Sequence, residues 1–232
     1  MKNQYFGDIN DYRKYGILRI LAVDNWLKLG ICWMLTSGDG KSDGKKTKYL
    51  EDKWKWSGFD PILFDHLHQL VCVRRERDVR LIENAGLLPG ARFYGELITD
   101  DLAERQGSFA EMLEKFRNVD LIFFDPDNGL AVKSVPMGRK KSSKYLYWDE
   151  LERTFAAKHS VMVYQHFPHE NREGFIKRVK AEICSRLQAS SVLALATAHV
   201  VIFLAAQPNH EELFHQKSEL LKSQWNGQVV LA

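Results

Sequence analysis

The stretch LIFFDPDNGLAVK, residues 121–133, places four apolar residues directly before two carboxylates, Asp125 and Asp127. An apolar run of this length, bounded by turn residues, is typical of a strand that is buried on both faces. Asn128 and Gly129 are usual turn residues, so the strand is expected to end at Asp125. Two acids at the tip of a buried strand are costly to desolvate without a partner, and this favours a functional site over a simple turn cap.

Apolar runs and helical patterns alternate along the rest of the chain. Strands are predicted at residues 31–36, 68–73, 91–98, 119–125, 160–166, 191–197, 199–206 and 228–232, and helices at 11–28, 74–86, 108–117, 147–157, 172–188 and 210–225. Strands separated by helices favour a parallel sheet with helices on both faces, whereas 191–197 and 199–206 are so close that they must form an antiparallel hairpin. The predicted fold class is therefore α/β. A mostly parallel sheet with a late antiparallel hairpin is the arrangement of the Rossmann-like methyltransferase fold.

Length and composition set the limits of this prediction. The chain has 232 residues, of which 45% are hydrophobic, enough for one large core. We expect a single domain over residues 1–232, with an insertion around residues 41–68 between the first two strands. No apolar run is long enough to span a membrane, and the opening residues lack the apolar stretch of a signal peptide, so a cytoplasmic protein without a membrane partner is predicted. The three cysteines lie far apart in apolar segments, which favours reduced core thiols.

The order of motifs resembles the RlmJ-type methyltransferases, which modify adenine N6 in 23S ribosomal RNA. The matching segments are FGDINDYRKY (6–15), ICWMLTSGDG (31–40), LIFFDPDN (121–128), VMVYQHFP (161–168) and HVVIFLAAQPN (199–209). The three-Cys-motif partner proteins are similar more loosely, and the Asp-Pro-Asp-Asn-Gly signature resembles that of a widespread bacterial family. The likeness covers nearly the whole chain in order, although each motif is short.

The resemblance implies S-adenosylmethionine as cofactor and nucleic acid or a nucleotide as substrate. The cofactor would be held by Lys14, Tyr15, Gly38, Asp39 and Gly40. The Asp125 side chain and the Pro126 carbonyl would accept hydrogen bonds from the amine that is methylated. Asp127 and His166 complete the candidate catalytic group, and the candidate substrate-binding residues are Asp11, Asn128, Tyr164 and Arg172.

Some positions depart from the pattern of the resembled family. Asp127 stands where a second proline is expected, and Asn128 replaces the tyrosine that stacks on the flipped base. Tyr145, Tyr147, Trp148 or Tyr164 could supply that ring instead. The predicted strand 68–73 has no acid at its end to bind the cofactor ribose, and the nearest one, Glu76, falls in the predicted helix that follows.

Two other functions remain open from the residues alone. Asp125-x-Asp127 after an apolar strand is a common way to hold Mg²⁺ or Mn²⁺ beside phosphates, which would indicate a nuclease or a nucleotidyl or glycosyl transferase. Alternatively, the protein is a non-catalytic scaffold that binds RNA, a nucleotide or another protein.

Histidine and basic residues add candidates near the same rim. His166 ends a predicted strand in YQHFPHENR (164–172), where it could act as a general base or metal ligand, or only lie in a wet loop. The net charge is only +3, but basic residues cluster in the predicted loop 138–144 and in the predicted helix at 171–180. The loop suits a polyanion, while the helix is interpreted as a solvated face.

Overall fold

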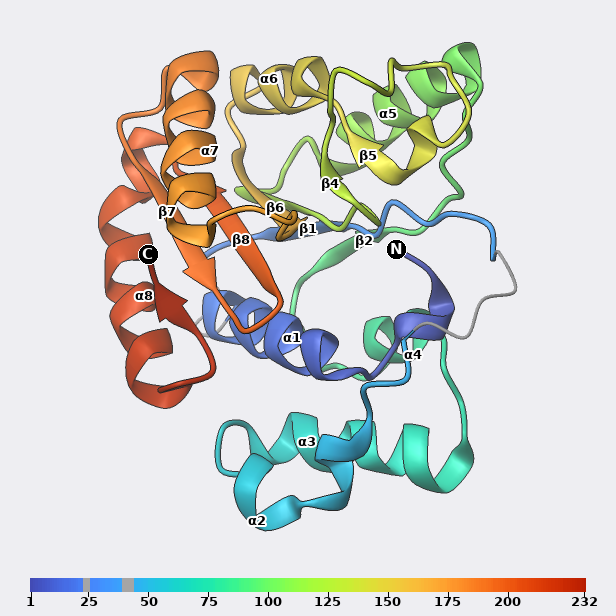
Figure 1. Cartoon of the computed structure of the whole chain (residues 1–232), viewed down its shortest axis with the longest axis vertical. Helices are drawn as coiled ribbons and strands as arrows, with labels where there is room; N and C mark the ends of the chain where they lie inside the picture. The colour runs from blue at the N-terminus through green and yellow to red at the C-terminus, as the bar shows by residue number, and fades with distance from the viewer. Residues whose placement is uncertain (23–25, 39–43) are drawn as a thin grey trace.

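The computed structural model describes residues 1–22, 26–38 and 44–232 and contains one central seven-stranded sheet (Figure 1). Its strand order is β2-β1-β3-β6-β8-β7-β9. The strands are β1 (Leu29–Cys32), β2 (Arg92–Tyr94), β3 (Leu121–Phe124), β6 (Ser160–His166), β7 (Val192–Ala196), β8 (Val200–Ala205) and β9 (Val230–Leu231).

The sheet is mostly parallel and carries the predicted late hairpin. β1, β2, β3 and β6 run parallel, with Ile31 beside Phe123 and Phe123 beside Met162. β8 is antiparallel to both β6 and β7, and β9 adds an antiparallel edge to β7. The prediction of an α/β sheet with one antiparallel hairpin is confirmed.

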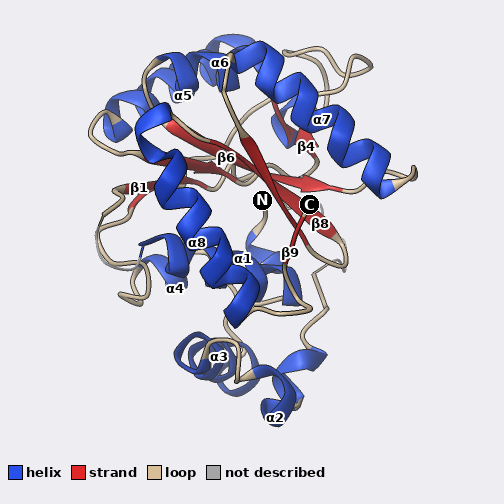
Figure 2. Cartoon of the chain, turned by 90° about the vertical axis from the view of Figure 1, so that its left-hand side faces the viewer, coloured by secondary structure: helices blue, strands red, loops and turns tan. Residues whose placement is uncertain are grey.

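Helices cover both faces of the sheet (Figure 2). One face packs against α1 (Ile9–Ala22) and α8 (Glu211–Gln224), and the other against α5 (Leu102–Phe116), α6 (Trp148–Ala156) and α7 (Arg172–Leu187). Side chains of a strand alternate between faces, so Leu121 and Phe123 join the first core while Ile122 and Phe124 join the second. This two-sided burial explains why the strand reads as a continuous apolar run.

The chain between β1 and β2 is helical, and one predicted strand there is wrong. It contains α2 (Lys53–Trp56), α3 (Pro61–His68), the π-helix η4 (Gln69–Arg74) and α4 (Arg80–Glu83). Residues 68–73 therefore continue a helix, because Leu63, Leu67 and Leu70 recur at helical spacing and are buried together. Cys72 is consequently exposed and is not a core thiol.

Smaller elements complete the fold. β4 (Gly129–Leu130) and β5 (Tyr145–Leu146) form a separate parallel pair beyond the tip of β3. The 3₁₀ helices are η1 (Asn3–Tyr5), η3 (Lys48–Glu51), η5 (Ser142–Lys144) and η6 (Pro208–His210). α5 begins at Leu102 with Asp101 as N-cap, six residues before the predicted start at residue 108. None of the described helices has the length and apolarity to cross a membrane.

Candidate functional site

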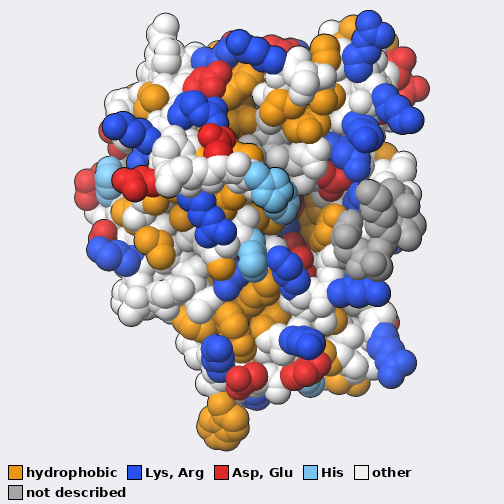
Figure 3. Space-filling model, viewed as in Figure 1, with side chains coloured by type: hydrophobic (Ala, Val, Ile, Leu, Met, Phe, Trp, Pro, Cys, Tyr) orange, Lys and Arg blue, Asp and Glu red, His pale blue; other side chains and the backbone are white. Residues whose placement is uncertain are grey.

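An acidic cavity of about 260 Å³ lies beyond the carboxyl ends of β3 and β6. Asp125, Pro126 and Asp127 reach it from the end of β3, His166 from the end of β6, and several residues from the start of α1. The strand order reverses between β1 and β3, and ligands of open α/β sheets bind at such a point. Figure 3 shows a hollow near the middle of this face, with acidic side chains inside it and histidine side chains at its edge.

Lys14 is the central charge of the site. Its Nζ lies 2.7 Å from Asp11 Oδ1 and 2.6 Å from Asp125 Oδ2, and its side chain is only 2% exposed. The rings of Tyr15, Trp33 and Tyr164 lie 5.2 to 5.5 Å from the ammonium. Burial disfavours the charge on Lys14, but the two carboxylates outweigh burial and raise its pKa. Lys14 therefore stays protonated and fixes the orientation of Asp125.

Asp11 has an unusual protonation equilibrium for a carboxyl group. Its Oδ2 accepts hydrogen bonds from the Gly7 amide and the Tyr15 hydroxyl, both at 3.1 Å. Burial raises the pKa of Asp11 to about 7, against the effect of Lys14, and the nearby carboxylate of Asp8 adds to the rise. The cavity wall can thus hold or release a proton near neutral pH.

Asp127 joins the loops that follow β1 and β3. Its Oδ2 accepts a 2.7 Å hydrogen bond from Thr36 Oγ1, and its Oδ1 forms an ion pair at 3.1 Å with the Met1 amino group. Apart from this ion pair, the buried Oδ1 has no hydrogen-bond partner among the described residues. The amino group instead donates to the carbonyls of Met34 and Asp125, at 2.8 and 3.0 Å. Met1 thus lies across the tips of the two strands.

The backbone at the tip of β1 is strained where it meets Met1. Met34 adopts a left-handed conformation with φ 46°, which costs a residue with a side chain about 1 kcal/mol or more. The Met1 carbonyl also accepts a 2.9 Å hydrogen bond from the Thr36 amide. The contacts with Met1 therefore help to hold the turn after β1 in this conformation.

Acidic and basic groups share this cavity, and burial raises the pKa of Asp8 and Asp11 and lowers that of the Met1 amino group. Four carboxyl groups line it, those of Asp8, Asp11, Asp125 and Asp127, and three amino groups, those of Met1, Lys14 and Lys46. Asn10 also lines the cavity, and its buried Oδ1 has no hydrogen-bond partner in the described part of the chain. The cavity is therefore suited to a cation or to a hydrogen-bond donor such as an amine.

His166 lies between this cavity and a larger one. It is exposed at the end of β6, lines both cavities, and its ring meets that of Tyr164 edge-on at 5.2 Å. Desolvation by surrounding protein lowers the pKa of His166, against the pull of Asp125. A neutral imidazole is therefore expected at pH 7, and it can accept a proton.

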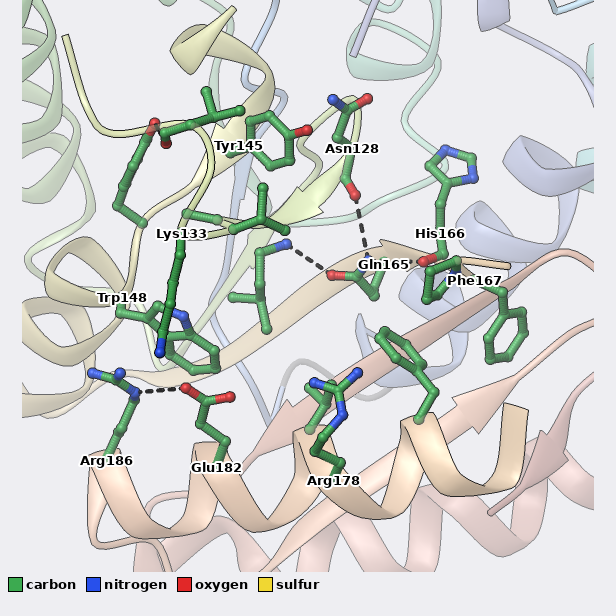
Figure 4. A pocket seen from close by; sticks show the side chains of 18 of the residues that line it. Asn128, Lys133, Tyr145, Trp148, Gln165, His166, Phe167, Arg178, Glu182 and Arg186 are labelled. Carbon is green, nitrogen blue, oxygen red and sulfur yellow. Dashed lines mark hydrogen bonds and ion pairs between the residues drawn. The ribbon is translucent and has the colours of Figure 1, made fainter. Parts of the chain in front are cut away.

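The larger cavity is a cleft of about 800 Å³ between the β4–β5 segment and α7 (Figure 4). Asn128 and Gln165 form its inner end, next to His166. Gln165 Nε2 donates to the carbonyls of Asn128 and His166, and its Oε1 accepts from the Leu130 amide at 2.8 Å. The Gln165 side chain thus holds the turn after Asp127 against the end of β6.

The structure brings most of the predicted site residues together. Those that line the acidic cavity are Asp11, Lys14, Asp125, Pro126, Asp127, Tyr164 and His166. Tyr15 is buried behind Lys14, and Asn128 lines the larger cleft instead.

Two other residues that were predicted to bind cofactor or substrate, Gly38 and Arg172, do not line either cavity. Gly38 is exposed in the loop after β1, in open space and outside both cavity walls. Arg172 also lies outside both, and its guanidinium packs 4.8 Å from the Phe167 ring. Asp39 and Gly40 lie outside the described residues.

The sequence reasoning missed the capping role of Asp8 and the presence of Met1 in the site. Asp8 is the residue that caps α1, because its Oδ1 accepts from the amides of Asn10 and Asp11 at 2.8 and 3.0 Å. The spacing of Asp8 ahead of the helix could have indicated this. No sequence pattern indicates that Met1 belongs to the site, because its position depends on contacts with residues far along the chain.

The acid after the second strand is not the one that the sequence suggested. Because β2 is Arg92–Tyr94 and not residues 68–73, the acid that follows the second strand is Glu96, not Glu76. Glu96 is exposed, and its neighbour Leu97 pairs with Leu35 in the extension of β1. A carboxylate thus lies beside the loop that follows β1.

Neither metal-ligand geometry nor comparison with known proteins assigns a function to the site. Within residues 1–22, 26–38 and 44–232, no group of three or more His, Cys, Asp or Glu side chains is arranged to hold a metal ion. No protein-family model matches the chain, and neither does any curated protein.

Proposed function

We propose that the protein is an S-adenosylmethionine-dependent methyltransferase of Rossmann-like fold that acts on an amino group of nucleic acid or a nucleotide. The observation that carries the proposal is the placement of Asp125, Pro126 and Asp127 in an acidic cavity at the tip of β3. The sheet around it has four parallel strands followed by an antiparallel β7–β8 hairpin, the arrangement expected for this class.

The residues at the strand tips fit the cofactor. Bound S-adenosylmethionine supplies a methyl group on a positively charged sulfur. Carboxylates and the ring of Tyr164 in the cavity favour such a cation. Glu96 is an exposed carboxylate next to the loop after β1, where it can accept hydrogen bonds from ribose hydroxyls.

The chain's own residues orient the acceptor. Asp125 is held by Lys14 through one oxygen, so it presents its carboxylate in one direction, and the Pro126 carbonyl supplies a second acceptor. Holding an amine in line with the methyl group provides most of the rate gain for a displacement of this kind. The amine nitrogen loses a proton when the new bond to carbon forms, and neutral His166 can take it.

A label-transfer assay tests the proposal. Protein, methyl-labelled S-adenosylmethionine and single-stranded RNA, single-stranded DNA or mononucleotides are incubated separately, and incorporation into each is measured. We expect transfer to one of the three and a loss of about 100-fold or more in His166→Gln, an exposed position where the fold should tolerate the change. Lys177→Ala, on the exposed side of α7, serves as a control with unchanged activity.

Other outcomes assign the alternatives. Absence of transfer to any acceptor, together with no binding of S-adenosylmethionine or of Mg²⁺, would favour the non-catalytic scaffold. Shortening of the RNA in the presence of Mg²⁺, abolished in Asp127→Ala, would favour the metal-dependent function instead.

A further inference from the structure

The larger cleft is lined by aromatic side chains from three parts of the fold. Tyr145 comes from β5, Trp148 from the start of α6, and Phe167 from the loop after β6. Figure 4 shows Tyr145, Trp148 and Phe167 arranged around the cleft above α7. Aromatic rings around a cavity of about 800 Å³ give flat ligands a place to stack.

Two basic segments border this cleft. Residues 133–144 carry five Lys or Arg side chains and no acid, while α7 carries five Lys or Arg side chains and two acids. Lys133 reaches the cleft from the first segment, and Arg178 and Arg186 from the second (Figure 4). Lys133 and the arginines of α7 therefore lie on opposite sides of one cavity, which Glu170 and Glu182 also line. The helix is thus not only the solvated face that was expected.

The charges of the two segments are paired to different extents. Arg178 forms an ion pair with Glu170 at 2.7 Å, and Arg186 pairs with Glu152 and Glu182. The exposed cations of the loop, Lys133, Arg139, Lys140 and Lys141, make no ion pair with the described residues. Of these loop cations Lys133 lines the cleft, where it offers a charge without an ion pair among the described residues. The helix side offers oriented guanidinium groups over aromatic rings, as with Arg186 at 4.7 Å from the Trp148 ring.

We propose that this cleft binds single-stranded nucleic acid, with bases stacked on its rings and phosphates along its basic borders. Rings combined with a positive groove are the usual means of binding unpaired strands, because every base has a flat face and every phosphate a charge. A duplex keeps its bases stacked on one another and cannot use the rings. The cleft meets the acidic cavity at His166, so a strand in it would place the neighbouring base beside Asp125.

The statement that this strand is the substrate rests on the proposed function, but its binding does not. The test therefore uses fluorescence anisotropy without S-adenosylmethionine. The probes are a labelled 12-nucleotide RNA, the DNA of the same sequence, and the corresponding DNA duplex, each at about 50 to 200 mM KCl. We expect saturable binding of a single strand and at least about fivefold weaker binding of the duplex.

Neighbouring residues of α7 provide a matched pair of variants. Arg178 lines the cleft, whereas Lys177 lines a different cavity on the other side of the helix. Log affinity for a single strand falls against log salt with a slope of about −0.7 for each phosphate that a cation neutralises. We expect the slope to become shallower by this amount in Arg178→Ala and in Lys133→Ala, and to stay the same in Lys177→Ala.

Aromatic variants test the stacking separately. Trp148→Ala should weaken single-strand binding by about fivefold or more, the effect of removing one base–aromatic stack. Phe167→Ala, in the loop after β6, repeats the test at a second ring of the cleft.

Several results would overturn the proposal. These are no single-strand binding at the lowest salt concentration, equal binding of the duplex, or an equal reduction of affinity in Lys177→Ala and Arg178→Ala. A different result would be single-strand binding in the expected pattern by a protein that does not bind S-adenosylmethionine. That result would support the nucleic-acid cleft and refute only the proposed function.

Discussion

At the scale of single residues, the buried ion cluster around Lys14 holds the site in place. The side chains of Lys14, Asp11 and Asp125 are exposed by 5% or less, and each oxygen–nitrogen distance is 2.7 Å or shorter. A buried charge that loses its partner is far more costly than a pair that was never formed. The cluster therefore couples the architecture of the site to the stability of the fold.

Replacing Lys14 by methionine should destabilise the protein strongly. The substitution nearly keeps the length of the side chain but leaves Asp11 and Asp125 without their cation. We expect the free energy of unfolding in urea at pH 7 to fall by about 3 kcal/mol or more. The exposed ion pair of Lys53 and Asp65 provides a control, since Lys53→Met should change the free energy of unfolding by less than about 1 kcal/mol. Equal reductions in the two variants would contradict this account of Lys14.

Asp11 should make stability depend on pH. Its pKa is about 7 in the folded protein against an unperturbed 3.8, so between these values the native state holds a proton that the unfolded chain has released. The contribution of Asp11 is thus greatest at low pH and is lost as the pH rises toward 7, by up to about 1.4 kcal/mol per pH unit.

Urea unfolding from pH 5 to pH 8 measures this effect. The wild type should lose stability relative to Asp11→Asn, which cannot titrate, as the pH rises to about 7, and the difference should then level off. Parallel profiles for the two proteins would show that Asp11 does not bind the proton.

At the scale of elements, local patterns predicted strands and helices unequally well. The strands at 121–124 and 160–166 are recognisable because they are buried on both faces and are read as uninterrupted apolar runs. Residues 68–73 gave the same signal but continue a helix, since a short apolar run is ambiguous without its partners. Serine is a common N-cap residue, so Ser108 was the predicted N-cap of this helix, but Asp101 caps α5 instead. The sequence between the two residues has no strong apolar periodicity that would reveal the earlier start.

At the scale of the whole molecule, the arrangement of the sheet followed from the order of the elements. Parallel strands need helical crossovers, and the short gap within the late hairpin permits only an antiparallel pair, so these features were predictable. The gathering of Asp125, Asp127 and His166 was predictable for the same reason, because they all follow or end strands.

The rest of the site depends on contacts between distant parts of the chain. The Met1 amino group meets Asp125, and the basic loop 133–144 faces α7 across the cleft. No local pattern encodes these pairings, which arise only when the strands are in register. This explains why the acidic motif was found from the sequence while the aromatic cleft beside it was not.

Calorimetric titration of S-adenosylmethionine into the protein measures whether the strand tips hold this cofactor. We expect saturable binding to one site with a dissociation constant below about 1 mM, weakened about tenfold or more in Glu96→Gln and unchanged in Lys177→Ala. The absence of saturable heat up to about 1 mM ligand, with the protein folded, would contradict this expectation.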